Sequence, residues 1–432
     1  MKFKLGFLFL IFGNFLNAQE LLTAEEAVAI ALKNNYDIKI AANNVKIDEQ
    51  NISLANAGLL PTLAATFVKN NAIQDSRQTQ MDGSLRELNN AKNNRMEYGV
   101  GFDWTIFDGF RMFARYDQLK ELQKLGEAQL KLTVLTKVGD VMSTYYDLVQ
   151  QQQVLKAMDT AIVISQQRVT LEENRFTIGK ASKLEVLNAQ VDLNTDRTNY
   201  LRQKELYQNR KTVLNEILAR DLYADFVVSD SARIDTKLEL PDLISRSESQ
   251  NPQIQMAVLN KRVAELNLRQ IRGNRYPQVR VNTGYIITDT ESSLGFARQS
   301  HGKGFNYGIS ASINIFNGFL QNRHEKIAKL EIENSAVVIE QQNQLVTSQL
   351  ITAYQTYLTN LELVGLEEKN EQIAKQNLDI TLEKHKIGTI TTIEVRTAQL
   401  NYINAMTRNS NAKYQAKISE ITLKELAGNI TF

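Results

Sequence analysis

"IFDGF" at residues 106–110 and "IFNGF" at residues 315–319 are nearly the same five residues, present twice in a chain of 432. The two copies lie 209 residues apart. The same offset relates a second pair of segments, "IGKASKLEVLNAQ" from Ile178 and "IGTITTIEVRTAQ" from Ile387. Matches that recur at one spacing indicate two copies of one structural plan rather than a chance pentapeptide.

Each copy of the pentapeptide closes a segment in which apolar and polar residues alternate. In "EYGVGFDWTIF", which begins at Glu97, and in "FNYGISASINIF", which begins at Phe305, large apolar side chains occupy nearly every second position. This period of two predicts β-strands with one apolar face. The residues that define the predicted apolar face are Tyr98, Val100, Phe102, Trp104, Ile106, Tyr307, Ile309 and Ile313.

Upstream of each strand, a proline separates a helical pattern from a shorter partner strand. The two prolines, Pro61 and Pro277, are 216 residues apart, so a loop accounts for the difference between the two offsets. Each copy therefore contributes one hairpin. We expect helices at about 35–60 and 252–275, partner strands at 62–69 and 279–288, and exposed polar loops at about 70–95 and 289–303.

After each Gly-Phe pair the pattern changes to that of a long helix without proline. Apolar residues then recur at alternating spacings of three and four, which is the spacing of coiled-coil packing. Each long helix ends at an Ile-Gly pair, and a second helix returns. The heptad positions are Leu135, Val138, Met142, Tyr145 and Val149 in the first copy and Ile351, Tyr354, Leu358 and Leu361 in the second.

The N-terminus resembles a secretory signal, because lysines precede an apolar run that ends in Asn17-Ala18. The chain has no cysteine, so export would leave it without disulfides. Its formal charge of +2 and the absence of like-charge blocks argue against a nucleic-acid partner. No later apolar stretch is long enough for a transmembrane helix, so membrane insertion would require a β-barrel.

Two hairpins supply four strands, which are too few to close a barrel. If the apolar face contacts lipid, several chains must share one barrel. Three chains with twelve strands are the smallest number that leaves a central opening. Small or polar residues such as Asp103, Asn306 and Ser310 on the other face suit a water-filled lumen. A soluble sandwich with one hydrated face is the alternative that the strand pattern leaves open.

The repeated order of helix, proline, hairpin ending in Phe-Asx-Gly-Phe, long helix, glycine tip and returning helix resembles the TolC family of bacterial outer-membrane channel proteins. "LTAEEAVAIALKNN" at 22–35 also resembles the opening helix of that family. The resemblance implies an α+β membrane protein, a homotrimer whose twelve-stranded β-barrel continues into a long α-helical coiled-coil tunnel across the periplasm. It implies an exit duct in the outer membrane for drug efflux or type I secretion.

The resemblance also implies partners and a division of the chain. The partners are outer-membrane lipid, a periplasmic adaptor and an inner-membrane transporter, without a cofactor. Gly109 and Gly318 supply permissive backbone where strands pass into helices. We expect a signal peptide at 1–18, repeats at 19–218 and 251–427, an equatorial linker at 219–250 and a tail at 428–432. Within the repeats we expect hairpins at 62–107 and 279–316, long helices at 110–178 and 319–387, and return helices at 183–218 and 392–426.

In the family, the turn between long and returning helices carries the gate and the adaptor contacts. An acidic residue commonly follows the tip glycine by six positions, as Glu185 and Glu394 do here, whereas Thr397 replaces a second carboxylate. His385 replaces a tyrosine, and Glu185 is its candidate partner; the alternative is that these are solvated helix-end residues. The predicted gate is Glu394, Thr397, Glu185, Asn188 and His385, and the predicted docking tip is Gly179, Lys180, Gly388 and Thr389.

No catalytic or metal-binding constellation is expected. "RHEK" at 323–326 lacks the second His of a zinc-protease helix, and "GKAS" at 179–182 lacks the upstream Gly of a phosphate loop. The rival to a duct is a periplasmic coiled-coil adaptor or scaffold without a pore. Such a protein would not need an apolar strand face.

Overall fold

The computed structural model describes residues 20–229, 233–293 and 297–429. The predicted signal peptide and residues 430–432 of the predicted tail lie outside this range. The chain divides into two compact units, each assembled from separate segments. We call them the tip unit, which comprises Met1–Ile40, Lys131–Asn251 and Gln344–Phe432, and the sheet unit, which comprises Ala41–Leu130 and Pro252–Asn343.

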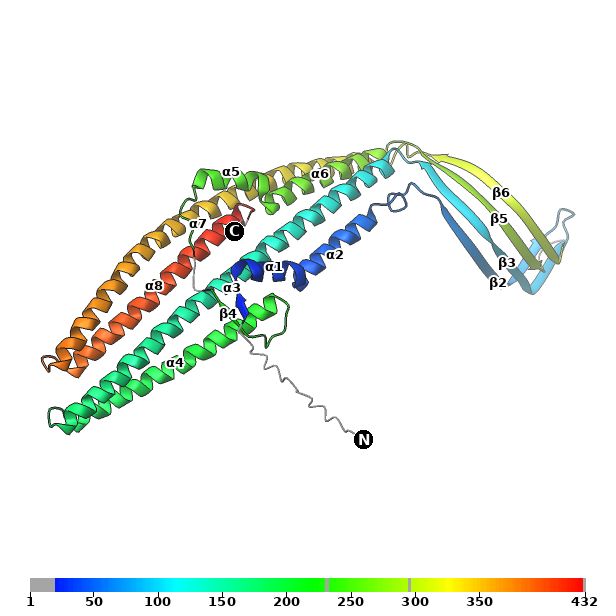
Figure 1. Ribbon diagram of the computed structural model, residues 1–432. Coiled ribbons are helices and arrows are strands. Elements are labelled where there is room, and N and C mark those ends of the chain that lie inside the picture. The colour runs from blue at the N-terminus through cyan, green and yellow to red at the C-terminus, as the bar shows by residue number, and fades with distance from the viewer. Residues whose placement is uncertain (1–19, 230–232, 294–296, 430–432) are drawn as a thin grey trace, which may run out of the picture. The chain divides into compact units, whose positions relative to one another are not determined.

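The sheet unit contains one antiparallel sheet in the order β2, β3, β5, β6 (Figure 1). The strands are β2 (Thr62–Thr79), β3 (Leu85–Phe107), β5 (Gln278–Ser292) and β6 (Gln299–Ser312). The predicted loops at 70–95 and 289–303 are therefore largely wrong, because both hairpins continue through these polar stretches. Backbone hydrogen bonds pair the strands regardless of side-chain polarity. The polar stretches of the sequence therefore did not mark where the strands end.

The register places most of the large apolar residues of the four strands on one face of the sheet, whereas Val68 and Ile286 lie on the other face. Directly opposed residues in an antiparallel pair share a face. One row contains Leu63, Phe102, Thr283 and Tyr307, and another contains Ala65, Val100, Tyr285 and Phe305. A row on the other face contains Ala64, Gly101, Gly284 and Asn306. The alternation seen in single strands is thus continuous across the sheet.

The Asx-Gly-Phe sequence forms the turn from strand to helix in both copies. Gly109 and Phe110 have φ values of 74° and 65°, and Gly318 and Phe319 have values of 66° and 63°. A carboxylate oxygen of Asp108 accepts a hydrogen bond from the N–H of Met112 at 3.1 Å, and Asn317 does the same for Gln321 at 3.3 Å. Two left-handed residues end the strand, and the Asx side chain caps the helix that follows.

The helices repeat in length between the two halves. α3 (Arg111–Thr177) and α7 (Leu320–Lys386) each have 67 residues, and α4 (Lys183–Ile217) and α8 (Thr392–Leu426) each have 35. At 1.5 Å per residue, each long helix extends for about 100 Å. None of the described helices has a segment long and apolar enough to cross a membrane.

The helices before the two prolines differ in length. α6 (Pro252–Gly273) follows the prediction, but α2 (Tyr36–Asn51) ends well before the predicted residue 60. The side-chain amide of Asn56 donates to the carbonyl of Asn51 at 3.0 Å, and Gly58 has a φ of 85°. Local side-chain bonds of this kind compete with helical ones, so a turn replaces the last part of the helix.

The main apolar core of the tip unit surrounds α3 near α1 (Ala24–Asn34). Two short parallel strands, β1 (Glu20–Leu22) and β4 (Phe226–Val228), pair beside it. The buried Tyr145 hydroxyl donates to the carbonyl of Leu22 at 2.9 Å and accepts from the N–H of Ser229 at 3.1 Å. The sequence did not reveal these strands, because three residues are too few for a period to be recognised. α5 (Leu240–Gln250) completes the predicted linker region.

The predicted coiled-coil positions are confirmed only in the first copy, where Leu135, Val138, Met142, Tyr145 and Val149 are all buried. In α7, the predicted Ile351 and Leu358 are exposed within the chain. The buried side chains there belong to Val346, Leu350 and Tyr357. Spacings of three and four do not decide which of two adjacent apolar stripes contacts the neighbouring helix.

Candidate functional site

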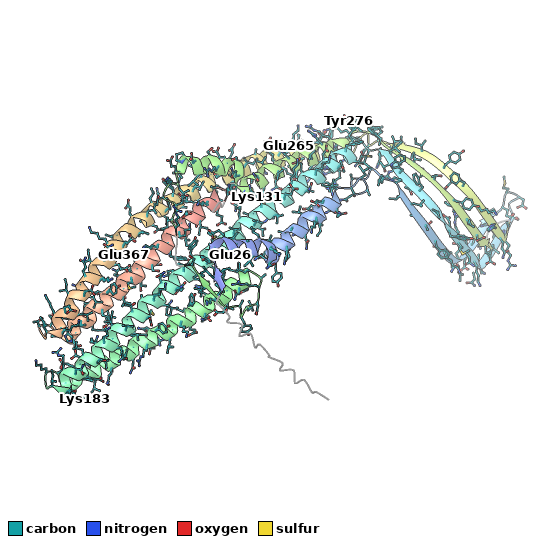
Figure 2. The ribbon with its side chains drawn as sticks, viewed as in Figure 1. Glu26, Lys131, Lys183, Glu265, Tyr276 and Glu367 are labelled. Atoms are coloured by element: carbon teal, nitrogen blue, oxygen red, sulfur yellow. The ribbon has the colours of Figure 1, made fainter. Side chains whose placement is uncertain are left out.

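The two helical hairpins of the tip unit end in matching exposed turns (Figure 1). Gly179 and Gly388 have φ values of 74° and 82°, and a Cβ atom at either position would meet nothing within 4 Å. The next N–H groups, of Lys180 and Thr389, donate to carbonyls five residues back at 2.7 and 3.1 Å. The left-handed backbone alone therefore requires glycine at both turns. These four residues are the predicted docking tip, and Figure 2 labels Lys183 just after the first turn.

Both predicted gate carboxylates cap their own helices. Ser182 and Thr391 are the N-cap residues of α4 and α8, and Glu185 and Glu394 are at the third helical position. The carboxylate of Glu185 accepts from the N–H of Ser182 at 2.6 Å, and that of Glu394 from the N–H of Thr391 at 2.7 Å. The bond from the Thr391 N–H lowers the pKa of Glu394. Each pair forms a capping box.

A group of polar side chains, which we call the tip seam, joins the two hairpins. Its members on α3 are spaced by three and four residues and therefore lie on one face of that helix. The side chains are buried or half-buried. The tip seam comprises Ser165, Arg168 and Glu172 on α3, Asp192 and Asp196 on α4, His385 on α7, and Arg396 and Gln399 on α8.

Arg396 binds Asp196 with both terminal guanidinium nitrogens, at 2.7 and 2.9 Å. The hydroxyl of Ser165 donates to the same carboxylate at 2.5 Å, and the amide of Gln399 donates to Ser165 at 2.8 Å. Burial lowers the pKa of Arg396, but the bonds to Asp196 outweigh burial and raise the pKa. The fork between arginine and carboxylate is therefore charged and geometrically specific.

His385 occupies the other end of the tip seam, close to the turns. Its Nε2 lies 2.6 Å from a carboxylate oxygen of Glu172, and its Nδ1 lies 3.1 Å from the carbonyl oxygen of Ile390. Nη1 of Arg175 lies 3.3 Å from the same Nε2, so a carboxylate, a backbone carbonyl and a guanidinium group surround the imidazole ring. The predicted pairing of His385 with Glu185 is wrong, because Glu185 caps α4 and Glu172 takes its place.

Only some of the polar atoms in the tip seam are hydrogen-bonded. Arg168 is buried and binds Asp192 through one guanidinium nitrogen. Its other two nitrogens, Nε and Nη1, have no hydrogen-bond partner among the described residues, and neither does Oε2 of Glu172. Buried polar groups without partners cost free energy. The contact between the hairpins is therefore weaker than an apolar contact of the same size would be.

The remaining predicted gate residues and the residues of the predicted apolar face lie outside the tip seam. Asn188 and Thr397 are exposed, and the Thr397 hydroxyl donates to the carbonyl of Ile393 in its own helix at 3.0 Å. On the apolar face, a bulge between Thr105 and Phe107 leaves Ile106 without a direct partner on β5, and Ile313 lies just beyond β6. Among the described residues, no group of three His, Asp or Glu is arranged to hold a metal ion.

The sequence interpretation missed Arg396, Asp196 and Glu172. A signal existed for Asp196, which continues the stripe of buried positions Val186, Ala189 and Leu193 on α4 at spacings of three and four. A carboxylate at an apolar heptad position indicates a buried partner. The identity of that partner, 200 residues away, is not visible in the pattern.

The sequence model of one protein family, described as outer membrane efflux protein, matches residues 27–220 and 243–429. The chain belongs to the outer membrane efflux protein family. Curated relatives include Outer membrane protein TolC of Escherichia coli (strain K12), which is 20% identical over 384 residues, covering 81% of this chain and 78% of that protein. Proteases secretion protein PrtF of Dickeya chrysanthemi is 17% identical over 426 residues, covering 97% and 90%.

Several solved structures have the same fold as this chain. The CmeC outer membrane channel of Campylobacter jejuni has a TM-score of 0.77 and 18% sequence identity, and the match covers 94% of this chain and 85% of that one. At this identity, the likeness concerns the fold. The family assignment rests on the sequence match to both halves of the chain.

Proposed function

We propose that this protein is the outer-membrane exit duct of a drug efflux pump or a type I secretion system. It conducts substrates passively from an inner-membrane transporter and a periplasmic adaptor to the outside. The family match over both halves of the chain carries the proposal. The scaffold without a pore has no such support, since the family name and the names of TolC, PrtF and CmeC describe outer-membrane, secretion or channel proteins.

The sheet supports a barrel shared by three chains. Four strands leave two open edges, and twelve strands close around a lumen. The apolar face would contact lipid, and the face with Gly101, Asp103 and Asn306 would line the lumen. Gly109 and Gly318 would mark the level at which barrel strands pass into tunnel helices. The proposed lipid-facing residues are Tyr98, Val100, Phe102, Trp104, Ile106, Tyr307, Ile309 and Ile313.

Equivalent contacts support a duplicated chain. The side-chain amide of Asn35 donates to the carbonyl of Ile217 at 2.8 Å, and that of Asn251 donates to Leu426 at 2.9 Å. The first residues of these pairs are 216 apart and the second residues 209 apart, which are the offsets found in the sequence. We therefore propose repeats at 19–218 and 251–427, joined by an equatorial linker at 219–250.

The tip seam supports a gate at the free ends of the hairpins. Its partly satisfied contacts would hold the first hairpin against the second in a closed state. Opening would separate Arg396 from Asp196 and His385 from Glu172. In a trimer, Glu394 would form an acidic ring that attracts cations, near Glu185, Asn188 and Thr397. The exposed turns at Gly179, Lys180, Gly388 and Thr389 would contact the adaptor.

The proposal is tested on the protein purified in detergent and inserted into planar bilayers. We expect a trimer by native mass measurement and discrete channel openings. Phe102→Arg should reduce assembly, because a charge on the lipid face costs about 2–4 kcal/mol near the bilayer midplane. Asp103→Asn, the adjacent residue on the other face, is the matched control. A water-soluble monomer without channel activity, or equal defects in the two variants, would contradict the proposal.

A further inference from the structure

The strap, which we define as residues 233–239, leads into α5 without helical or strand structure (Figure 1). Two buried side chains of α8 hold its backbone. The ammonium of Lys417 donates to the carbonyl of Arg233 at 2.8 Å. A carboxylate oxygen of Glu420 accepts from the N–H of Asp235 at 3.0 Å. These bonds satisfy backbone groups of the strap and give it a defined position against α8.

A cavity of about 550 Å³ lies between the strap and helices α1, α3 and α8. All of its lining residues belong to the tip unit. The buried apolar side chains that line it are those of Met142, Tyr146 and Ile421. Arg233 and Lys237 also line it and are exposed, so the cavity opens to solvent at the strap. Its volume is that of a small-molecule site, for which roughly 300–1,000 Å³ is usual.

Tyr146 brings an unused hydrogen-bond donor to this cavity. The residue is only 8% exposed, and its hydroxyl has no hydrogen-bond partner among the described residues. Burial raises the pKa of Tyr146 to about 12, so the hydroxyl stays protonated at neutral pH. A buried hydroxyl without a partner costs free energy. A donor in this position therefore suits a ligand that carries an acceptor oxygen.

The charges around the cavity favour an anion. The ionic side chains that pair with one another there are Lys417, Lys424, Asp235 and Glu420. Arg233, Lys237 and Glu25 also line the cavity, and none of the three has an ion-pair partner within the described part of the chain. Two cations without a partner thus stand against one such carboxylate. The buried apolar side chains, in turn, favour a ligand with an apolar body over an inorganic anion.

We propose that this cavity binds a small organic anion, a carboxylate with an apolar body. The apolar body contacts Met142 and Ile421, the Tyr146 hydroxyl donates to an oxygen of the ligand, and Arg233 and Lys237 attract its charge. The site lies within one chain and goes beyond the proposed duct. Ligand binding and channel activity can therefore be tested separately.

The probes are 1-naphthoate and its neutral analogue 1-naphthamide, titrated calorimetrically into the full chain purified in detergent, with protein-free detergent as the blank. We expect naphthoate to bind about tenfold more tightly than naphthamide, because only naphthoate carries the charge. Arg233→Gln/Lys237→Gln should weaken naphthoate binding roughly fivefold, and Glu25→Gln should strengthen it, since it removes the repelling carboxylate. Arg246→Gln, which changes an exposed cation of α5 outside the cavity, is the matched control and should leave affinity unchanged.

Tyr146→Phe separates binding from folding. It removes a hydroxyl that no described residue binds, so the unfolding temperature without ligand should not fall. Naphthoate affinity should drop about fivefold, which is the effect of one lost hydrogen bond. The same affinity in Tyr146→Phe and wild type would remove the hydroxyl from the site.

Three results would overturn the proposal as a whole. The first is no binding of naphthoate to the wild type at millimolar concentration. The second is equal affinity for naphthoate and naphthamide, or an equal loss in Arg246→Gln and Arg233→Gln/Lys237→Gln, which would show that the cavity does not select the anion. The third is weaker naphthoate binding in Glu25→Gln, since an anion site should gain from this change. A protein that binds naphthoate but forms no channel would contradict only the proposed duct.

Discussion

The turns of the two helical hairpins have the same backbone but different side chains where the hairpins meet. Both have a left-handed glycine followed by a capping box, and both return helices have 35 residues. Phe176 in the first hairpin is 44% exposed, whereas its counterpart His385 is 1% exposed and bound to Glu172. Leu187 is exposed, whereas its counterpart Arg396 binds Asp196.

The difference lies in the charged side chains that cross the contact between the hairpins. In the ion pairs between the hairpins, the first hairpin supplies the carboxylates Glu172, Asp192 and Asp196, and the second supplies His385 and Arg396. Ala405 is the counterpart of Asp196, so the charges are not themselves repeated. Two hairpins with the same turn backbone therefore bind each other through unlike side chains.

The largest expected effect comes from replacing Arg396 of the second hairpin by leucine, the residue at the equivalent position of the first hairpin. Arg396→Leu leaves Asp196 as an uncompensated buried charge. We expect the free energy of local opening of the hairpin tips to fall by about 3–5 kcal/mol. Amide hydrogen exchange along α4 and α8 measures this quantity.

In the double variant Arg396→Leu/Asp196→Ala, each position carries the residue found at the equivalent position of the other hairpin. It removes the stranded charge and should recover most of the loss, because apolar replacements of ion pairs are often close to neutral. Equal opening free energies in the single and double variants would show that the ion pair is not the source of the effect.

His385→Phe is the second exchange between the copies. It leaves Glu172 without its hydrogen-bond partner, at a cost of about 1–3 kcal/mol. In planar bilayers, the closed state should be less stable and basal conductance higher. The reciprocal Phe176→His changes an exposed side chain and should leave conductance unchanged. Similar conductance in wild type and His385→Phe would remove His385 from the gate.

The capping boxes should respond alike in both hairpins. Ser182→Ala and Thr391→Ala each remove a hydroxyl that accepts the N–H of the third helical residue. Each should cost about 1 kcal/mol in hydrogen exchange of the first helical turn. A cost confined to one hairpin would mean that the two turns, despite their equal geometry, are not equivalent.

The smallest expected effect is a gain in thermal stability when Glu425, near the end of α8, is replaced. Burial raises the pKa of Glu425, nearby Asp140 adds to the rise, and a hydrogen bond with Thr136 opposes it. Because the pKa in the folded state is above the unfolded value of about 4.3, ionised Glu425 destabilises the fold as pH rises past that value. Glu425→Gln should therefore raise the thermal unfolding temperature at pH 7 and have little effect near pH 4.

Glu216 is the matched control, since it is the first-copy counterpart of Glu425 and is exposed. Glu216→Gln removes no buried charge, so its unfolding temperature should differ little from wild type at both pH values. A gain in Glu425→Gln that is as large at pH 4 as at pH 7 would show that ionisation is not its cause.

Much of the fold was predictable because its signals are local. The long helices were expected at 110–178 and 319–387 and lie at Arg111–Thr177 and Leu320–Lys386. Asx-Gly-Phe and Ile-Gly mark the ends of elements through φ angles that a few residues impose. The capping boxes were also readable as Ser182 or Thr391 followed three residues later by glutamate, although Glu185 and Glu394 were interpreted only through the family pattern.

The sequence by itself determined the order of the elements and the bounds of the long and return helices, since periodicity and turn preference act within a few residues along the chain. Only the tertiary structure decided that β2 and β3 continue through a polar stretch, that β1 pairs with β4, and that His385 meets Glu172 rather than Glu185. These contacts join residues that are far apart in sequence, and they depend on strand register and on the rotation of each helix about its axis. Neither quantity is encoded by the local spacing of side chains, because packing between elements sets both.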